Sequence, residues 1–321
     1  MSQVRELVRR RAYELLLVVL IAAALVWSAN VTSYLSVPQL FDSTRSFVVP
    51  GLLALGLLVV VLQGEIDISL ASTIGVGTVV LARLSAAGLA LPLAFIVVLA
   101  VCALLGAING VLVTVAGLPS LAVTLGTMGA YRGLAYLIGG DTGYSAFDPT
   151  YSSLGSQYAG IAPASLVLFL IVAVIVAFLL QRTVFGRQTY AVGSNPIASR
   201  VGGVPVNGVK IAAFTLAGLT AALAALVWIG QYGSARADNA DGSILFVVTA
   251  VVLGGADIAG GRGTVLGTVL SLFLLGTLTN GMNLINVGGP TQTLVLGILL
   301  VASIGIPRAA RLLLQRRARP A

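Results

Sequence analysis

Residues 47–87 read FVVPGLLALGLLVVVLQGEIDISLASTIGVGTVVLARLSAA, which is two apolar runs separated by the polar stretch 63–69. Each run is close to the length of about 20 residues that a helix needs to cross the hydrocarbon core of a membrane. Between the runs lie Glu65 and Asp67, and a charge inside a membrane is costly unless it faces a partner, a cavity or water. The stretch therefore predicts two membrane helices joined at a polar break.

The composition extends this interpretation to the whole chain. Of its 321 residues, 58% are hydrophobic and 9% are charged, and the mean hydropathy is +1.05, whereas an ordinary soluble domain carries about 25% charged residues. A water-soluble globule is therefore excluded, and we expect an all-α polytopic membrane protein with about ten transmembrane helices, which makes residues 1–321 one membrane domain. The predicted spans are 14–30, 47–63, 70–87, 91–115, 118–138, 164–181, 211–230, 243–254, 264–281 and 291–306. The span 243–254 is too short to cross alone, so it is either extended by its neighbours or re-entrant.

The basic residues indicate which side of the membrane each loop faces. The net charge is +8, and Lys and Arg gather on cytoplasmic loops. If the N-terminus is inside, 14 of the 18 basic residues fall in the tail 1–13, the loop 182–210, the turn around Arg262 and the basic tail 307–321. We therefore expect an even number of spans with both termini cytoplasmic, and we attribute the positive charge to membrane topology rather than to nucleic-acid binding.

Several kinds of chemistry are excluded by the residues that the chain lacks. It contains no histidine, one cysteine, Cys102, and one lysine, Lys210. Zinc sites and His-dependent catalysis are therefore excluded, and one cysteine cannot form an internal disulfide. The sequence has no G-x-x-x-x-G-K-[ST] phosphate loop. We expect a transport protein and not an enzyme, with no cofactor in this chain and an energy source elsewhere.

Two sets of residues recur later in the chain with closely similar spacing and indicate an internal repeat; they are called the first and the second echo below. Asn109-Gly110, Pro119 and Gly126 recur as Asn280-Gly281, Pro290 and Gly297, and parts of 61–79 recur in 252–269. Duplicated bundles around a midplane pathway are typical of transporters. The span count makes the first echo inverted and the second parallel, which one rigid duplication cannot produce. Either one echo is chance or one segment is re-entrant.

Glu65, Asp67 and Ser69 in the polar break are candidate residues of a substrate pathway. A broken helix exposes polar side chains and freed backbone groups near the midplane of a transporter. The alternative is a plain loop with acids at the membrane surface. That loop would be an acidic inner turn in a chain whose other inner loops are basic. We therefore expect a broken helix whose carboxylates line a polar pathway or hold the bundle together.

A second set of candidate pathway residues consists of Ser120, Thr124 and Thr127. Their spacing of i, i+4 and i+7 places the three hydroxyls on one helix face. Such a face suits a hydroxylated solute, but hydroxyls also bond their own helix or join neighbouring helices, and both interpretations stay open. Arg132, near the outer end of the same span, either extends to the interface or pairs with an acid.

The longest inner loop, 182–210, contains GSNPIASR at 193–200. Asn195 is placed to cap a short helix that begins at Pro196, because proline at the first helical position loses no needed hydrogen bond. A short helix projecting from a bundle suits docking into a groove of a soluble partner. The alternative is a basic loop that only sets topology.

Four stretches resemble, in family order, motifs of the ribose, xylose, arabinose and galactoside class of ABC importer permeases. Residues 64–72, GEIDISLAS, are similar to G-G-I-D-L-S-V-G-S, and residues 119–128, PSLAVTLGTM, are similar to P-S-x-x-x-T-L-G-T-M. Residues 186–203 resemble G-R-x-x-x-A-x-G-x-N-x-x-A-A-R-x-x-G, and residues 254–286 resemble a glycine-rich motif followed by N-G-x-N. The resemblance covers about residues 45–306.

This resemblance implies a permease subunit with a type II ABC importer-like fold in the bacterial cytoplasmic (inner) membrane. Its implied partners are cytoplasmic ATP-binding-cassette ATPases, which carry ATP and Mg, an extracytoplasmic solute-binding protein, membrane lipid, and a second permease copy or a paralogous permease. The implied ATPase-coupling residues lie in the loop 182–210. They are Gly186, Arg187, Gly193, Asn195, Pro196, Ala198 and Arg200.

Some positions depart from the family pattern. Glu65 and Ala71 replace family glycines, Ala256-Asp257 replaces a small-Ser pair, and 244–246 replaces an acidic stretch of many relatives. These departures are similar to rhamnose-type or autoinducer-2-type branches, in which two unlike permeases pair. We therefore expect an importer of a monosaccharide or related small polar solute, and the alternative is an ion-coupled secondary transporter in which Glu65 and Asp67 relay the ion.

Overall fold

The computed structural model describes residues 14–28, 37–147, 150–151, 157–160 and 162–317. The predicted tail 1–13, the last two residues of the first predicted span and residues 318–321 of the basic tail lie outside the described residues. The N-terminal helix is Glu14–Ser28. The other elements are α2 (Val37–Ser43), α3 (Arg45–Val61), α4 (Leu70–Ala86), α5 (Leu91–Thr114), α6 (Ser120–Gly139), β1 (Tyr158–Ala159), β2 (Ala162–Pro163), α8 (Ala164–Arg182), α9 (Val184–Ser194), α10 (Pro196–Val201), α11 (Val206–Tyr232), α12 (Ser243–Leu253), α13 (Val265–Leu284) and α14 (Gly289–Arg317).

Each of the ten predicted spans coincides with one helix, so the predicted all-α polytopic fold is confirmed. Four described helices, α5, α8, α11 and α13, are long and apolar enough to cross a membrane, and five shorter apolar helices accompany them. The main differences from prediction are at the ends. Helix α14 continues to Arg317, and the inner loop is mostly helical because α9 and α10 fill it.

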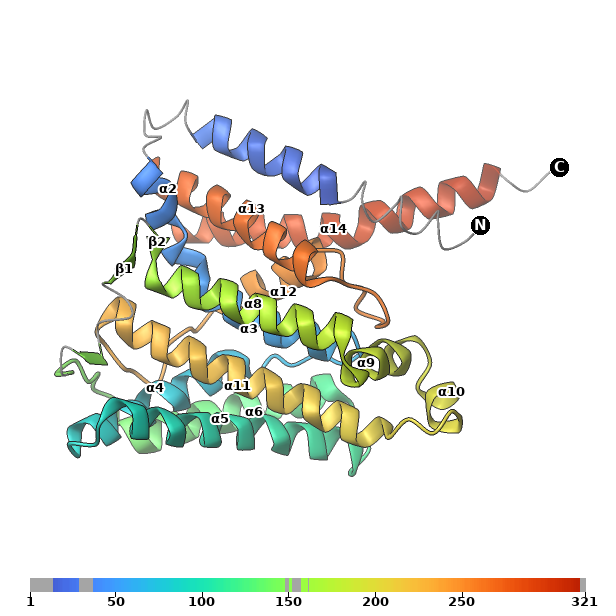
Figure 1. Cartoon of the computed structure of the whole chain (residues 1–321). Coiled ribbons are helices and arrows are strands. Elements are labelled where there is room, and N and C mark those ends of the chain that lie inside the picture. Colours follow the sequence, from blue (N-terminus) through green and yellow to red (C-terminus); the bar gives the residue numbers. More distant parts are fainter. Residues whose placement is uncertain (1–13, 29–36, 148–149, 152–156, 161, 318–321) are drawn as a thin grey trace.

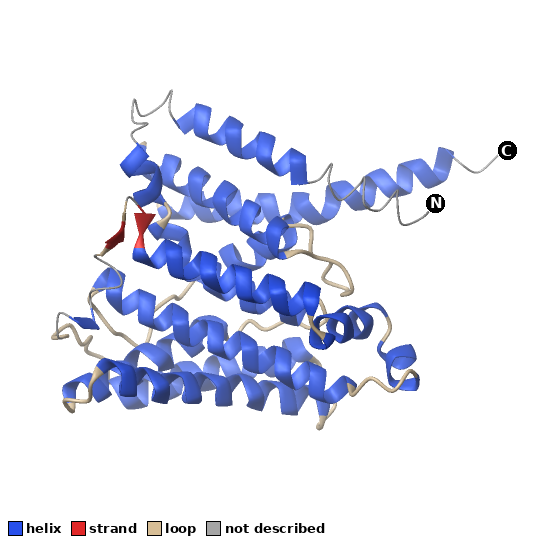
Figure 2. Cartoon of the chain, viewed as in Figure 1, coloured by secondary structure: helices blue, strands red, loops and turns tan. Residues whose placement is uncertain are grey.

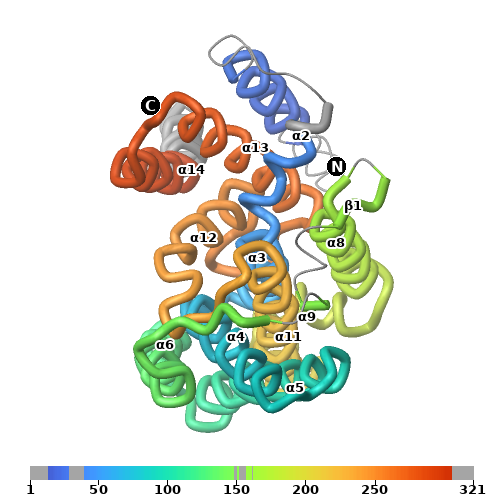
Figure 3. The backbone as a smooth tube through the Cα atoms, turned by 90° about the vertical axis from the view of Figure 1, so that its left-hand side faces the viewer, coloured from blue at the N-terminus to red at the C-terminus, as the bar shows by residue number. Residues whose placement is uncertain are grey.

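The burial of each helix shows where it lies in the bundle. Helix α3 is buried on all sides from Phe47 to Val61 apart from Pro50, and it packs on α8, α11, α12 and α13. Figure 3 shows α3 at the centre of the bundle, viewed along the helices. Helices α5 and α8 are equally apolar, yet only 28% and 39% of their most apolar windows are buried. Apolar side chains on an open face are what lipid contact requires.

The chain passes back and forth between the two ends of the bundle (Figure 1). Helices α9 and α10 lie at one end, together with the Glu14 end of the N-terminal helix and the C-terminal end of α14. The β1–β2 pair, which is antiparallel with Tyr158 opposite Pro163, lies at the other end. We call these the inner and outer ends, after the sides of the membrane that the basic residues predict for them. The two described ends of the chain lie at the same end of the bundle, as an even number of passes requires.

Helix packing repeats between the two halves of the bundle. Helix α4 packs on α5, α6 and α11, and in the other half α12 packs on α13, α14 and α3; likewise α5 packs on α11, and α13 on α3. These pairs correspond when α3–α6 are matched in order to α11–α14, and matched helices run in opposite directions (Figure 1). The first echo therefore marks an inverted repeat. The second echo would match α3 to α12, but the packing within α3–α5 does not recur within α12–α14.

Two passes are completed by non-helical chain, and the inverted repeat matches them to each other. The stretch 62–69 precedes α4 at the inner end, and the stretch 233–242 precedes α12 at the outer end. Figure 2 shows such non-helical chain in tan within the bundle. Helix α12, which has 11 residues, is therefore extended by its neighbours rather than re-entrant. Below, 62–69 is called the inner segment and 233–242 the outer segment.

Small residues allow the central helices to approach closely. A Cβ added to Gly106 or Gly110 of α5 would meet the backbone of α11, and one added to Gly218 of α11 would meet the carbonyl of Cys102. Small residues at helix crossings let backbones touch in the membrane, where lipid removes the usual hydrophobic driving force. Cys102 itself is buried in this crossing as a free thiol.

Candidate functional site

The inner segment is held by hydroxyl groups of α6. Helix α3 ends at Val61, and Gly64, whose φ is +77°, turns the chain away from the helix direction. The backbone N–H of Ile66 donates to Ser120 Oγ at 3.2 Å, and the hydroxyl of Thr124 donates to the carbonyl of Ile66 at 3.2 Å. Backbone groups that leave a helix inside a membrane need such replacement partners. Ser120 and Thr124 therefore stabilise the break between α3 and α4.

A directed chain of hydrogen bonds ends at Asp67. Tyr131 Oη lies 3.1 Å from Asn109 Oδ1, and Asn109 Nδ2 donates to Ser69 Oγ at 2.9 Å. The hydroxyl and backbone N–H of Ser69 both donate to Asp67 Oδ1, at 2.6 and 2.9 Å. Asn109 and Ser69 thus donate toward the carboxyl group of Asp67, a residue that is 1% exposed, whereas the nearer acceptor of the Tyr131 hydroxyl is the Leu105 carbonyl at 2.8 Å. This arrangement fixes Asp67 at the start of α4 and connects it to α5 and α6.

Three buried polar atoms of the described side chains lack a hydrogen-bond partner, and all belong to residues 63–72. They are Gln63 Oε1, Asp67 Oδ2 and Ser72 Oγ. An unsatisfied buried polar group costs about 1–3 kcal/mol, and native proteins contain only a few per 100 residues. Two of the three belong to the inner segment and the third to the first turn of α4, so polar side chains are concentrated at this break.

The charged part of the inner segment binds the start of α11. Glu65 forms an ion pair with Lys210, and their side chains are 15% and 16% exposed. Beside them, the Gln63 amide donates to the Val209 carbonyl at 3.2 Å and lies 3.5 Å from Thr189 Oγ1. The inner segment is thus joined to both α9 and α11.

The outer segment has a comparable attachment to α6. The guanidinium of Arg132 donates to the carbonyls of Ala237 and Asn239 and pairs with Asp241 at 3.1 Å. Of the two roles predicted for Arg132, the structure shows pairing with an acid. At the exposed face of the segment, Arg236 forms an ion pair with Asp238 at 2.9 Å.

The predicted short helix that Asn195 caps is confirmed at the inner end. Helix α10 begins at Pro196, and Asn195 Oδ1 accepts the N–H of Ala198 at 2.9 Å. The apolar side chains of Ile197 and Val201, at i and i+4, are 78% and 86% exposed. The sequence did not indicate α9, which begins at the N-cap Thr183 and leads directly into α10.

Two glycines of α9 allow this helix to pack closely against the ends of α3 and α8. A Cβ on Gly193 would overlap the carbonyl of Leu62, and one on Gly186 would overlap the carbonyl of Leu180. The N–H of Gly261 donates to that same Leu62 carbonyl at 2.8 Å. Gly193 therefore places α9 in direct contact with the end of α3.

The structure brings most of the predicted pathway residues together. Asp67, Ser69, Ser120 and Thr124 surround Ile66, whereas the Thr127 hydroxyl lies 3.5 Å from the Thr124 carbonyl of its own helix. The predicted coupling residues Gly186, Arg187, Gly193, Asn195, Pro196, Ala198 and Arg200 all lie on α9 or α10 or between them.

Other members of the network were not identified as site residues from the sequence. They are Gln63, Asn109, Tyr131 and Lys210. Two of them could have been noticed in the sequence. Asn109 begins the first echo, and Lys210 is the only lysine of the chain, in an inner loop whose other basic residues are arginines.

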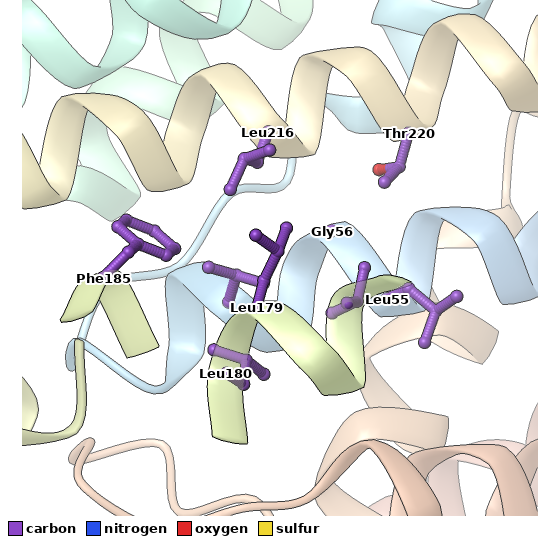
Figure 4. A pocket seen from close by; sticks show the side chains of 9 residues that line it. Leu55, Gly56, Leu179, Leu180, Phe185, Leu216 and Thr220 are labelled. Carbon is purple, nitrogen blue, oxygen red and sulfur yellow. The ribbon is translucent and has the colours of Figure 1, made fainter. Parts of the chain in front are cut away.

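A small apolar pocket lies near these helices. It lies between α3, α8, α9 and α11 and has a volume of about 20 Å³ (Figure 4). Leu55, Leu179, Phe185, Leu216 and Thr220 line it, and the Thr220 hydroxyl donates to the Ala217 carbonyl of its own helix. Small-molecule sites usually measure about 300–1,000 Å³, so this pocket is a packing defect and not a solute site.

Comparison with known proteins agrees with the geometry. Residues 39–304 match the family described as "Branched-chain amino acid transport system / permease component". The chain is similar to the "Autoinducer 2 import system permease protein LsrD" of Klebsiella pneumoniae, with 37% identity over 295 residues, 90% of this chain and 89% of that protein. The same-named proteins of Enterobacter sp. and Escherichia coli K12 are 35% and 32% identical, with coverage of 90% of both chains and 92% of both chains. No solved structure matches the chain. Because the family model covers residues 39–304 and these relatives match 90–92% of the chain, the chain belongs to this family of transport-system permease components.

Proposed function

We propose that this chain is the permease subunit of an ATP-binding-cassette importer that carries autoinducer 2, or a monosaccharide or related small polar solute, across the bacterial cytoplasmic membrane. The observation that carries the proposal is the near full-length similarity to permeases named for autoinducer 2 import. The family model also spans residues 39–304. The chain is a transport subunit, and ATP hydrolysis belongs to a partner.

Helix α10 is the proposed contact with the ATPase. It projects from the inner end, is capped by Asn195, and exposes Ile197 and Val201. An amphipathic helix with apolar residues at i and i+4 can enter a hydrophobic groove of a partner. ATP and Mg then act on the ATPase chain. A solute-binding protein delivers solute at the outer end, and a second permease, identical or paralogous, completes the pathway.

The inner and outer segments are the proposed gates of the pathway. Both are non-helical, both carry acids, and both are held by α6. Discontinuous helices in opposite halves of an inverted repeat are typical of alternating access, in which each side opens in turn. In this proposal Asp67, Ser69, Ser120 and Thr124 line the inner gate, with Glu65 at its mouth and Thr127 on the α6 face behind them.

Placement of α10 in the cytoplasm fixes the proposed orientation of the chain. The Glu14 end of the N-terminal helix and the end of α14 lie at the same end of the bundle as α10. This supports cytoplasmic positions for both tails, 1–13 and 307–321, in a multi-pass protein of the inner membrane. The basic residues of the inner loops agree with that orientation.

The ion-coupled alternative is disfavoured by the family match and by Glu65, which is neutralised by Lys210. The test is a gentle detergent purification of the chain from its native membrane, with mass spectrometry of the associated proteins and an ATPase assay. We expect an ATPase and a second permease to co-purify. Purification of the chain alone, with uptake in vesicles that needs an ion gradient and no ATP, would contradict the proposal.

A further inference from the structure

The Glu65–Lys210 ion pair differs from the other ion pairs of the described residues. Arg45–Asp42 and Arg236–Asp238 join residues close in sequence, and both are more exposed. Arg132–Asp241 joins residues 109 positions apart, but its carboxylate is 75% exposed. Glu65 and Lys210 lie 145 positions apart in sequence and are largely shielded from water. Shielded charges interact more strongly than exposed ones, because less solvent screens them. The pair is therefore a specific attachment of the inner segment to α11.

The pair lies at the junction between the docking element and the inner segment. Gln63, two residues before Glu65, contacts Thr189 of α9 and the carbonyl next to Lys210. Gly193, at the end of α9, lies against Leu62. A displacement of α9 and α10 by a partner therefore acts directly on the residues that surround the ion pair.

The unsatisfied atoms of the inner segment indicate that its present contacts are not its only ones. Gln63 Oε1 and Asp67 Oδ2 flank Glu65 in sequence and have no hydrogen-bond partner while they are buried. Movement of the segment away from α11 would expose these atoms to water or to a hydroxylated solute, which would satisfy them. The ion pair opposes that movement, because separating it leaves two charges in a partly dry environment.

We propose that Glu65 and Lys210 form an ionic latch that holds the inner segment closed against α11 until the docking element moves. This inference rests on the proposed function, because it assigns the latch to the inner gate of an ATP-driven importer. Glu65 stands where the resembled permeases have glycine, so the latch is a feature of this chain rather than of the motif. Its role is positioning, since neither residue needs to contact the solute.

The first test uses the purified importer complex in proteoliposomes. ATP hydrolysis is measured with and without loaded solute-binding protein for Glu65→Gln, Lys210→Met and the charge-swapped double variant Glu65→Lys/Lys210→Glu. We expect each single variant to raise hydrolysis without loaded binding protein roughly threefold to tenfold, as a shifted closed–open equilibrium does. The swapped variant should return within about twofold of the original. Asp42→Asn, in an exposed pair at the outer end, is the matched control and should behave as the original chain.

Single variants that hydrolyse ATP as the original does, or a swapped variant as deregulated as the singles, would overturn the latch. A covalent lock covers the case in which a single variant does not assemble. Glu65→Cys/Lys210→Cys is made in a Cys102→Ala chain, and the two cysteines are joined by a reducible bifunctional thiol reagent. We expect cross-linking to abolish solute uptake and reduction to restore it, and uptake by the cross-linked complex at the original rate would overturn the proposal.

These experiments distinguish a failure of the proposed function from a failure of the latch. If no ATPase assembles with the original chain, the proposed function is wrong. If the complex forms and transports with ATP but the lock has no effect, only the latch is wrong.

Discussion

At the scale of single residues, backbone contacts at the inner end join helices that are far apart in sequence. Gly193 lets α9 touch the Leu62 carbonyl, which also accepts the N–H of Gly261. One carbonyl thus joins α3, α9 and the turn before α13. Any side chain at position 193 must separate these three elements, since the atom it meets is backbone and cannot rotate away.

The Gly193→Ala substitution is therefore expected to destabilise the protein by ~1–3 kcal/mol through overpacking and to uncouple ATP hydrolysis from loaded binding protein. The midpoint of thermal unfolding in detergent and the stimulated ATPase rate are the measurements. Gly208→Ala is the matched control, because nothing lies within 4 Å of its added Cβ and alanine favours a helix by up to ~1 kcal/mol. Equal stability of the two variants would show that the close contact is not required.

The hydroxyls of α6 allow a second comparison. Thr124 bonds the Ile66 carbonyl, whereas Thr127 lies near the Thr124 carbonyl of its own helix and interacts with the side chain of Tyr131. Thr124→Val should lower the free energy of unfolding by ~1–3 kcal/mol, because the part-buried Ile66 carbonyl loses its partner. Thr127→Val should lower it less, by ~0.5–1 kcal/mol, because the Tyr131 hydroxyl keeps the Leu105 carbonyl as a partner. Thermal unfolding midpoints of the two variants would contradict this account if Thr127→Val were the more damaging.

At the scale of elements, the broken passes and the docking helix carry the function. Helix α10 has only six residues, too few to be stable without tertiary support and good caps. Its Asn195 cap and its continuity with α9 hold it in a fixed direction, so that Ile197 and Val201 project from the inner end. Removal of the cap therefore acts on partner binding rather than on the bundle.

For this reason Asn195→Ala should weaken co-purification of the ATPase and leave the unfolding midpoint of the bundle nearly unchanged. The expected loss is ~1 kcal/mol, about fivefold in affinity, whereas Asn195→Ser should retain the cap. Quantitative pull-down with increasing ATPase concentration distinguishes the two variants. An alanine variant that binds as tightly as the serine variant would show that the cap does not matter for docking.

Much of this element-level picture could be predicted from the sequence. Spans such as 91–115 and 164–181 were clear because membrane helices must be long and apolar, and the Asn195–Pro196 cap has a strong local signal. The partners of the inner segment could not be predicted, because contacts such as Asn109 with Ser69 and Glu65 with Lys210 join residues far apart in sequence. The role of α6 stayed open for the same reason. Its hydroxyl pattern fits both a solute path and helix contacts, and only packing shows that Ser120 and Thr124 hold Ile66.

At the scale of the whole molecule, the inverted repeat relates the inner segment to the outer one. Helices α3–α6 and α11–α14 repeat the same packing in opposite orientations. Breaks in corresponding passes, one near each end, give the bundle two regions that can open separately. This is the arrangement that alternating access requires.

The orientation of the bundle can be measured by thiol labelling in a Cys102→Ala chain. Ser145 lies exposed near the outer end, and Ser194 lies exposed at the end of α9. We expect Ser145→Cys to react with a membrane-impermeant maleimide in intact spheroplasts, and Ser194→Cys to react only after the membrane is permeabilised. Reaction of both positions from the same side would contradict the single pass that α8 makes between them.

The most direct test of the central claim is uptake by the reconstituted complex. The chain, its co-purifying ATPase and second permease, and the loaded solute-binding protein are placed in proteoliposomes, and accumulation of labelled autoinducer 2 and of labelled monosaccharides is measured with the binding protein on the outer-segment side. The account predicts accumulation of one of these solutes that requires ATP on the α10 side and persists when a protonophore collapses the proton gradient. Accumulation that proceeds without ATP and stops with the protonophore would contradict it.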